Sequence, residues 1–172
     1  TFKNKCNYRD PAGGNAALLK QFPQVNVYGS ATDEIPAMNK PVADKDQFTL
    51  GSSLHVSVIF APCHTKGHVL YHVSTADNEI SWLFSGDTFF VGGCGRFFEG
   101  DGNQMVQNVA RIKEQFLHNS KLAQTSMYCG HEYTVKNLEF ALAVEPENEY
   151  VKIALAQAKE KRSTGKPTVP SI

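Results

Sequence analysis

Three apolar runs in this 172-residue chain end in Gly or Pro and are followed closely by a side chain able to bind a metal. These side chains are His64 after 59–63, Asp87 after 83–86 and His131 after 127–130. If the runs are strands in register, the three side chains converge on one edge of a sheet. Two imidazoles and a carboxylate suit Zn, Fe or Mn, and the two oxygens of Asp87 allow it to bridge two ions.

Each of these residues also has a simpler interpretation. A His after a strand often caps it or lies on the surface, and an Asp after Gly often marks a turn. Cys63 and Cys129 near the two histidines suggest a Cys2His2 zinc site, but the chain has no compact C-x-x-C pair. Cys63 is alternatively a catalytic thiol or a packing residue. Because all three apolar runs end in the same way, with Gly or Pro followed by a possible metal ligand, we favour the shared metal site.

A glycine-rich segment, 92–102, follows the Asp87 strand and has five glycines in eleven residues. It matches neither the phosphate-binding pattern G-x-x-x-x-G-K-[ST] nor the dinucleotide pattern G-x-G-x-x-G between strand and helix. We expect a shaped loop in which Arg96, Phe97 and Phe98 contact a small anionic substrate. The alternative is an exposed loop with apolar anchors.

The elements that position these residues form a mixed pattern. Period-two or continuous apolar runs predict strands, and apolar spacings of three and four predict helices. The predicted strands are 25–28, 54–60, 69–74, 80–84 and 126–129, the predicted helices are 16–22, 105–116, 135–144 and 150–161, and 29–47 is a predicted surface loop. The fold class is therefore α/β or α+β, with the last two helices as an appendage to the sheet region.

Composition excludes several classes of protein. Seventeen Lys and Arg balance seventeen Asp and Glu, which excludes a strongly basic nucleic-acid-binding surface. No window approaches 18 apolar residues, so we expect no membrane span. Four Cys suggest a reducing compartment, and the segment 1–6 resembles no signal peptide. We expect a cytoplasmic monomer, or a protein of the mitochondrial matrix if a leader precedes this sequence.

Six segments together resemble glyoxalase II, the hydroxyacylglutathione hydrolase branch of the metallo-β-lactamase superfamily. They are APCHTKGH at 61–68, FSGDTFF at 84–90, GGCGRFFEG at 92–100, YCGHEYT at 128–134, VEP at 144–146 and GKPTVPS at 165–171. The resemblance implies an αββα sandwich, two divalent metals and hydrolysis of S-D-lactoylglutathione to D-lactate and glutathione. It also implies a metallo-β-lactamase-like domain over 1–133 and the start of a helical substrate-binding region over 134–172.

The resemblance also implies residue roles. His64 serves the first metal, His131 and Asp10 serve the second, and Asp87 bridges both, which makes Asp10 and Asp87 the catalytic carboxylates. The substrate-binding residues are Arg96, Phe97, Phe98, His131, Glu132 and Tyr133. The family usually has Tyr at position 98 and Lys at position 96. Phe98 therefore lacks the hydroxyl of that Tyr, and the Arg96 guanidinium keeps the positive charge of that Lys in a different geometry.

The start of the chain departs from the family. The family motif H-x-H-x-D-H corresponds here to residues 6–11, in which Cys6, Tyr8 and Pro11 replace the three histidines and Asp10 remains. Because Pro has no ligating side chain and a Tyr phenol is a poor ligand at neutral pH, we expect impaired activity. The family has further sequence before and after these segments, so the sandwich is expected to be incomplete. The alternatives are a non-catalytic relative that binds glutathione conjugates or a protein partner and, more weakly, a β-lactamase or another hydrolase.

Overall fold

The computed structural model describes residues 13–117 and 125–170. The elements in chain order are α1 (Asn15–Gln21), β1 (Tyr28–Ser30), β2 (Lys40–Val42), β3 (Gln47–Leu50), β4 (Leu54–Phe60), β5 (Val69–Thr75), β6 (Ser81–Gly86), β7 (Phe89–Phe90), β8 (Gly93–Cys94), α2 (Gly102–Leu117), β9 (Thr125–Cys129), α3 (Thr134–Val144) and α4 (Glu149–Ser163). The predicted α/β class is confirmed. None of these helices is long and apolar enough to cross a membrane.

Within the described residues, the main sheet has five strands in the order β3-β4-β5-β6-β9. Antiparallel pairing joins the first four, and β9 pairs with β6 in parallel after the chain has passed through α2. The parallel pairing brings the carboxyl ends of β6 and β9 to the same edge. Asp87 and His131, which follow those ends, are therefore neighbours.

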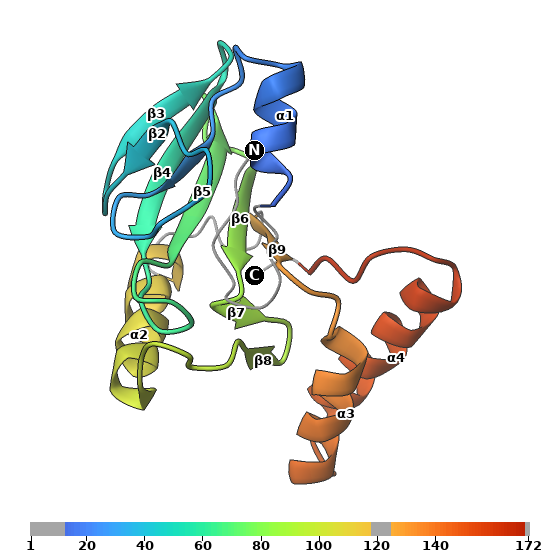
Figure 1. Cartoon of the computed structure of the whole chain (residues 1–172). Coiled ribbons are helices and arrows are strands. Elements are labelled where there is room, and N and C mark those ends of the chain that lie inside the picture. Colours follow the sequence, from blue (N-terminus) through green and yellow to red (C-terminus); the bar gives the residue numbers. More distant parts are fainter. Residues whose placement is uncertain (1–12, 118–124, 171–172) are drawn as a thin grey trace.

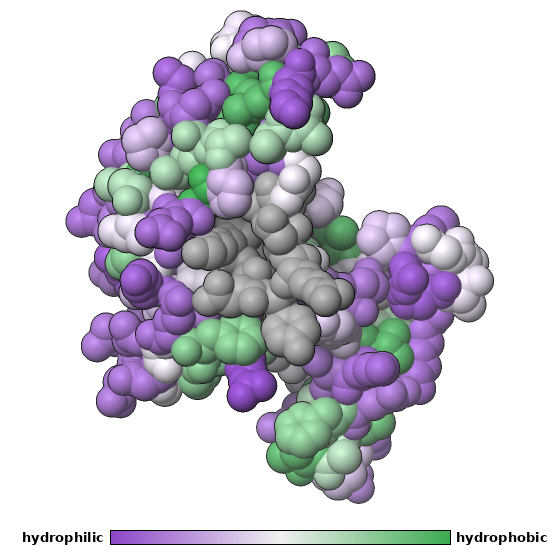
Figure 2. Space-filling model, in the orientation of Figure 1, coloured by the Kyte–Doolittle hydropathy of each residue, from purple (hydrophilic) through white to green (hydrophobic). Residues whose placement is uncertain are grey.

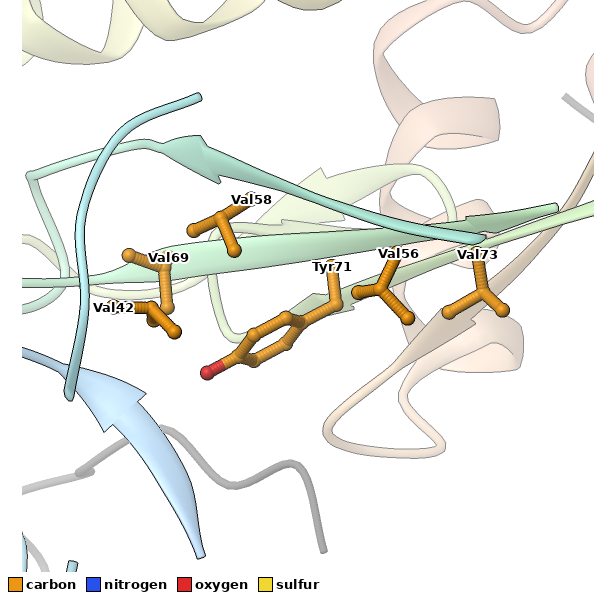
Figure 3. Packing of buried hydrophobic residues seen from close by; sticks show 6 residues of the cluster. All are labelled: Val42, Val56, Val58, Val69, Tyr71 and Val73. Carbon is orange, nitrogen blue, oxygen red and sulfur yellow. The ribbon is translucent and has the colours of Figure 1, made fainter. Parts of the chain in front are cut away.

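The sheet buries apolar side chains on both faces, because successive residues of a strand point in opposite directions. Val69, Tyr71 and Val73 of β5 pack on one face with Val42 of β2 (Figure 3). Leu70 of β5 points to the other face, where α2 covers it through a cluster that includes Phe116. The central strands are thus fixed from both sides, and they form a rigid base for the loops at their ends.

The last two helices form a hairpin that projects away from the sheet (Figure 1). Leu138 of α3 and Leu155 and Ala158 of α4 make a small core between them. Asn148 caps α4, since its side chain accepts hydrogen bonds from the backbone N–H groups of residues 150 and 151. Exposed apolar side chains gather toward the far end of the hairpin (Figure 2), and they are Phe140, Val144, Tyr150 and Ile153.

Two local predictions were wrong. The predicted surface loop 29–47 contains β2 and most of β1, which pair with each other in parallel, and the strand predicted at 25–28 lies instead at 28–30. The segment 89–94, which overlaps the predicted loop 92–102, contains the short antiparallel pair β7–β8. In both places the pairing partner stabilises a strand that is too short to show an alternating pattern, and β1, β2 and β8 also contain Gly or Pro. The boundary between 133 and 134 remains a prediction.

Candidate metal and substrate site

Asp87 is the centre of the candidate site. It follows the last residue of β6, and its side chain is buried, with 7% of the residue exposed. Its Oδ2 atom lies 3.4 Å from Nε2 of His64 and 3.5 Å from Nε2 of His131. The structure therefore brings together the three side chains that the sequence placed after strands. Both distances exceed the roughly 2.7–2.9 Å of a charge-assisted hydrogen bond.

A hydrogen bond at Nδ1 determines the tautomer of the His64 ring, and therefore whether Nε2, the nitrogen that faces Asp87, carries a proton or a lone pair. Nδ1 of His64 lies 2.8 Å from the backbone carbonyl oxygen of Arg96. A carbonyl only accepts hydrogen bonds, so Nδ1 carries the proton and donates it. In the neutral imidazole Nε2 then has a lone pair, which is the form that binds a metal.

Two glycines allow neighbouring segments to close against Asp87. A Cβ atom on Gly95 would overlap the backbone oxygen of Asp87 and would lie 3.0 Å from Nδ1 of His64. A Cβ atom on Gly130 would overlap Oδ1 of Asp87. Only glycine fits at these two points, so the glycine-rich loop is shaped around the backbone oxygen of Asp87 and the end of β9 around its carboxylate. The sequence indicated such a loop but not the atoms it approaches.

The donor set suits a divalent cation. Oδ1 of Asp87 is buried and has no hydrogen-bond partner within the described part of the chain, and an unsatisfied buried acceptor is costly. Two ligands about 2.1 Å from one tetrahedral ion lie about 3.4 Å apart, which matches both of the N···O distances around Oδ2.

The described residues supply only part of each ligand set. Within residues 13–117 and 125–170, no three His, Cys, Asp or Glu side chains gather closely enough to hold an ion by themselves. His64 and Asp87 provide one pair of donors, and His131 and Asp87 provide another. Asp10, the remaining predicted ligand, lies outside the described residues, as do Cys6, Tyr8 and Pro11.

Aromatic and cationic side chains flank the carboxylate on both sides. The Arg96 guanidinium lies 5.3 Å from the centre of the Phe98 ring, and Phe98 meets His64 edge-on at 5.1 Å. On the opposite side Tyr133 stacks on His131, with ring centres 5.0 Å apart and 11° between the planes. Phe98 and Tyr133 are 41% and 47% exposed, so both rings border solvent next to Asp87. Phe97 is also exposed.

Glu132, which was predicted to contact substrate, contacts the C-terminal segment. Its Oε2 accepts a hydrogen bond of 2.9 Å from the backbone N–H of Thr168, and its Oε1 accepts one from the Thr168 hydroxyl. Burial raises the pKa of Glu132, but the hydrogen bonds from Thr168 and Thr134 outweigh it and hold the pKa below its usual value. Thr168 was not singled out as a functional residue, and its only signal was its place within the family-like segment 165–171.

The alternatives that involve cysteine thiolates receive no support. Burial, followed by the neighbouring Cys94 and Asp101, raises the pKa of the Cys63 thiol, which opposes a reactive thiolate. The thiols of Cys63 and Cys129 donate hydrogen bonds to the backbone oxygens of Asp101 and His131. Both thiols therefore act as protonated donors, Cys63 in the buried interior and Cys129 at a partly exposed position.

His68 is a buried residue that contacts both the end of β6 and the His64 ring. It is buried, and its Nε2 donates to the backbone oxygen of Ser85 at 3.3 Å. Burial lowers its pKa to about 4, so the ring is neutral near pH 7. It meets the His64 ring edge-on at 5.9 Å. His68 thus packs between β6 and His64.

Comparisons with known proteins place the chain in a family. The model of the metallo-beta-lactamase superfamily matches residues 10–127, and the model of the hydroxyacylglutathione hydrolase C-terminus matches residues 132–172. The cytoplasmic hydroxyacylglutathione hydrolase of Arabidopsis thaliana is 43% identical over 162 residues, covering 94% of this chain and 61% of that protein. A hydroxyacylglutathione hydrolase-like protein of Gallus gallus is 44% identical over 163 residues, covering 94% of this chain and 55% of that protein.

The fold has a solved counterpart as well. The crystal structure of ETHE1 from Myxococcus xanthus has a TM-score of 0.53 and 28% identity, covering 68% of this chain and 47% of that one. The chain spans 55–61% of the length of the two curated relatives above. Sequence and fold therefore agree that the chain belongs to the metallo-beta-lactamase superfamily, and its curated relatives above are named hydroxyacylglutathione hydrolase (glyoxalase II) or hydroxyacylglutathione hydrolase-like.

Proposed function

We propose that the chain forms the metal-binding part of a thiolester hydrolase that cleaves S-D-lactoylglutathione to D-lactate and glutathione. The observation that carries this proposal is the position of the Asp87 carboxylate between Nε2 of His64 and Nε2 of His131. We infer two divalent ions, of Zn, Fe or Mn. His64 and Asp87 hold the first, and Asp10, Asp87 and His131 hold the second.

The protein's own groups prepare this site. When bound, the ions supply Lewis-acid polarisation of the thiolester carbonyl and increase the acidity of water. The Arg96 carbonyl keeps the His64 proton on Nδ1. The buried Asp87 carboxylate supplies negative charge where burial makes its attraction to cations strong. A thiolate leaves readily, so no strong general acid is required.

The same residues indicate how the substrate is held. Glutathione carries two carboxylates, and the exposed Arg96 guanidinium is a suitable partner for one of them. The Tyr133 phenol, which lies beside His131, donates a hydrogen bond to a peptide oxygen. Phe97 and Phe98 cover the apolar part of the thiolester. We propose a cytoplasmic monomer whose partner is this small molecule rather than nucleic acid or a membrane.

A second function is favoured by one sequence observation. Because Cys6, Tyr8 and Pro11 stand where the family has metal-binding histidines, the chain is alternatively a relative that binds glutathione conjugates without turning them over. In this case Arg96 and Tyr133 keep their binding roles, and the first ion is absent.

Metal analysis with a hydrolysis assay distinguishes the two functions. The purified chain is loaded with Zn²⁺, its metal content is measured, and loss of the S-D-lactoylglutathione thiolester is followed by absorbance. Two equivalents of metal with turnover, both abolished in Asp87→Asn, support the hydrolase. One equivalent or none, with binding of a glutathione conjugate but no turnover, supports the binding protein and overturns the hydrolase.

A further inference from the structure

We propose that Glu132 is a positioning residue, whose carboxylate fastens the C-terminal segment 166–170 to the strand-end loop 130–134. This contact, called here the Glu132–Thr168 clasp, holds the His131 and Tyr133 rings in place. Its consequence for metal and substrate binding rests on the proposed function, whereas its effect on the loop does not.

The clasp is a compact set of hydrogen bonds between residues 36 positions apart. Both carboxylate oxygens of Glu132 accept from Thr168, one from the backbone N–H and one from the hydroxyl. The Thr168 and Thr134 hydroxyls are also hydrogen-bonded, at 2.6 Å. Thr168 and Thr134 are buried whereas Glu132 is exposed, so the threonine side of the clasp is shielded from water and the carboxylate borders solvent. The two bonds to the carboxylate are charge-assisted.

The clasp lies directly beside the candidate site. His131 and Tyr133 stack on each other, while Glu132 between them reaches Thr168. Tyr133 is also the residue that precedes the first turn of α3. A shift of Glu132 therefore moves both neighbouring rings and the start of the hairpin together.

The C-terminal segment gives the clasp a firm attachment. Beyond α4 the chain returns to the sheet (Figure 1), where the backbone N–H of Met127 in edge strand β9 donates to the carbonyl of Pro170 at 3.0 Å. The hairpin is thus joined to the sheet covalently through 130–133 and non-covalently through 168–170. Asn137 of α3 also donates to the carbonyl of Val91 at 3.0 Å. Because these contacts remain, loss of the clasp should loosen the loop without unfolding the hairpin.

The test removes the clasp and measures the order of the loop directly. Thr168→Val keeps the shape and the backbone N–H but removes the hydroxyl, Glu132→Gln removes the charge, and Thr168→Ser restores the hydroxyl. The matched control is Glu139→Gln, which breaks the 2.8 Å ion pair between Lys159 and Glu139 across the same hairpin.

Cys129 is the reporter, because its thiol donates to the His131 carbonyl at 3.2 Å. Its alkylation rate by iodoacetamide is measured by peptide mass spectrometry on the whole chain, and buried Cys63 in the same samples reports global unfolding. We expect Thr168→Val to raise the Cys129 rate about five- to tenfold while Cys63 stays protected. Glu132→Gln should give a smaller increase, and Thr168→Ser and Glu139→Gln should match the parent.

Co²⁺ titration, followed by visible absorption, measures the consequence for the site. We expect Thr168→Val to weaken Co²⁺ binding about fivefold, with rescue by Thr168→Ser. An unchanged Cys129 rate in Thr168→Val, or an equal increase in Glu139→Gln, overturns the clasp. If the parent binds no Co²⁺, the proposed metal function fails, and the Cys129 rates still decide whether the clasp orders the loop.

Discussion

Replacing Gly95 by Ala should damage the site by pushing its loop away from Asp87. A Cβ atom at Gly95 would fall well inside the 3.0 Å that real Cβ atoms keep from other atoms, and its nearest neighbour is the backbone oxygen of Asp87. A backbone oxygen cannot rotate aside as a flexible side chain can. The loop must therefore move by about 1 Å before the clash is relieved.

That movement has a calculable effect on His64. The hydrogen bond from His64 Nδ1 to the Arg96 carbonyl is 2.8 Å long, and a shift of about 1 Å would take it beyond hydrogen-bond range. Losing this bond costs about 1 kcal/mol, and strain in the displaced loop adds about 1–2 kcal/mol. We expect Gly95→Ala to lower the free energy of unfolding by about 2–3 kcal/mol and to weaken Co²⁺ binding about tenfold, as loss of a support to a metal-binding His commonly does.

Urea unfolding and Co²⁺ titration of the parent and the variant measure these two effects. Gly102→Ala is the matched control, because a Cβ atom there meets nothing within 4 Å and the residue begins α2. The control should change the free energy of unfolding by less than about 1 kcal/mol. Equal behaviour of Gly95→Ala and Gly102→Ala would refute the reasoning.

Three further predictions concern the core, the pH dependence of stability and the substrate. Leu70→Ala should lower the free energy of unfolding in urea by about 2–5 kcal/mol, because Leu70 is fully buried under α2. Ile80→Ala, at an exposed position, should change it by less than about 0.5 kcal/mol. Similar losses in the two variants would contradict the assigned core. Burial lowers the pKa of His72, which lies edge-on to Phe116, so the unfolded state takes up the proton first as the pH falls below about 6.5 and stability is lost there. His72→Gln should flatten the decline of unfolding free energy between pH 7 and 5, and an unchanged slope would exclude this contribution. Where the Zn²⁺-loaded chain turns over the glutathione thiolester, Arg96→Ala should raise KM more than it lowers kcat, because it removes ground-state binding; a loss in kcat alone would exclude that role.

The sequence by itself determined the central strands and the residues at their ends. The runs 54–60 and 69–74 are apolar because both faces of the sheet are covered, and that signal is present in the residues themselves. His64, Asp87 and His131 stood out because ligand-type side chains follow strands at Gly or Pro, which is also a local pattern. The family-like segments added the expected activity.

Only the tertiary structure decided which groups meet. β1 was misplaced and β2 was missed because parallel pairing brings together residues about 12 positions apart, and neither short strand has a pattern of its own. The substrate role predicted for Glu132 came from the family resemblance. Its hydrogen bonds to Thr168 could not be predicted, because Thr168 lies 36 residues away. Gly95 was recognised as part of a shaped loop, but the atom that requires it to be glycine is the backbone oxygen of Asp87. Hydrogen bonds and close contacts depend on positions in space, whereas a sequence pattern reports mainly on neighbours along the chain.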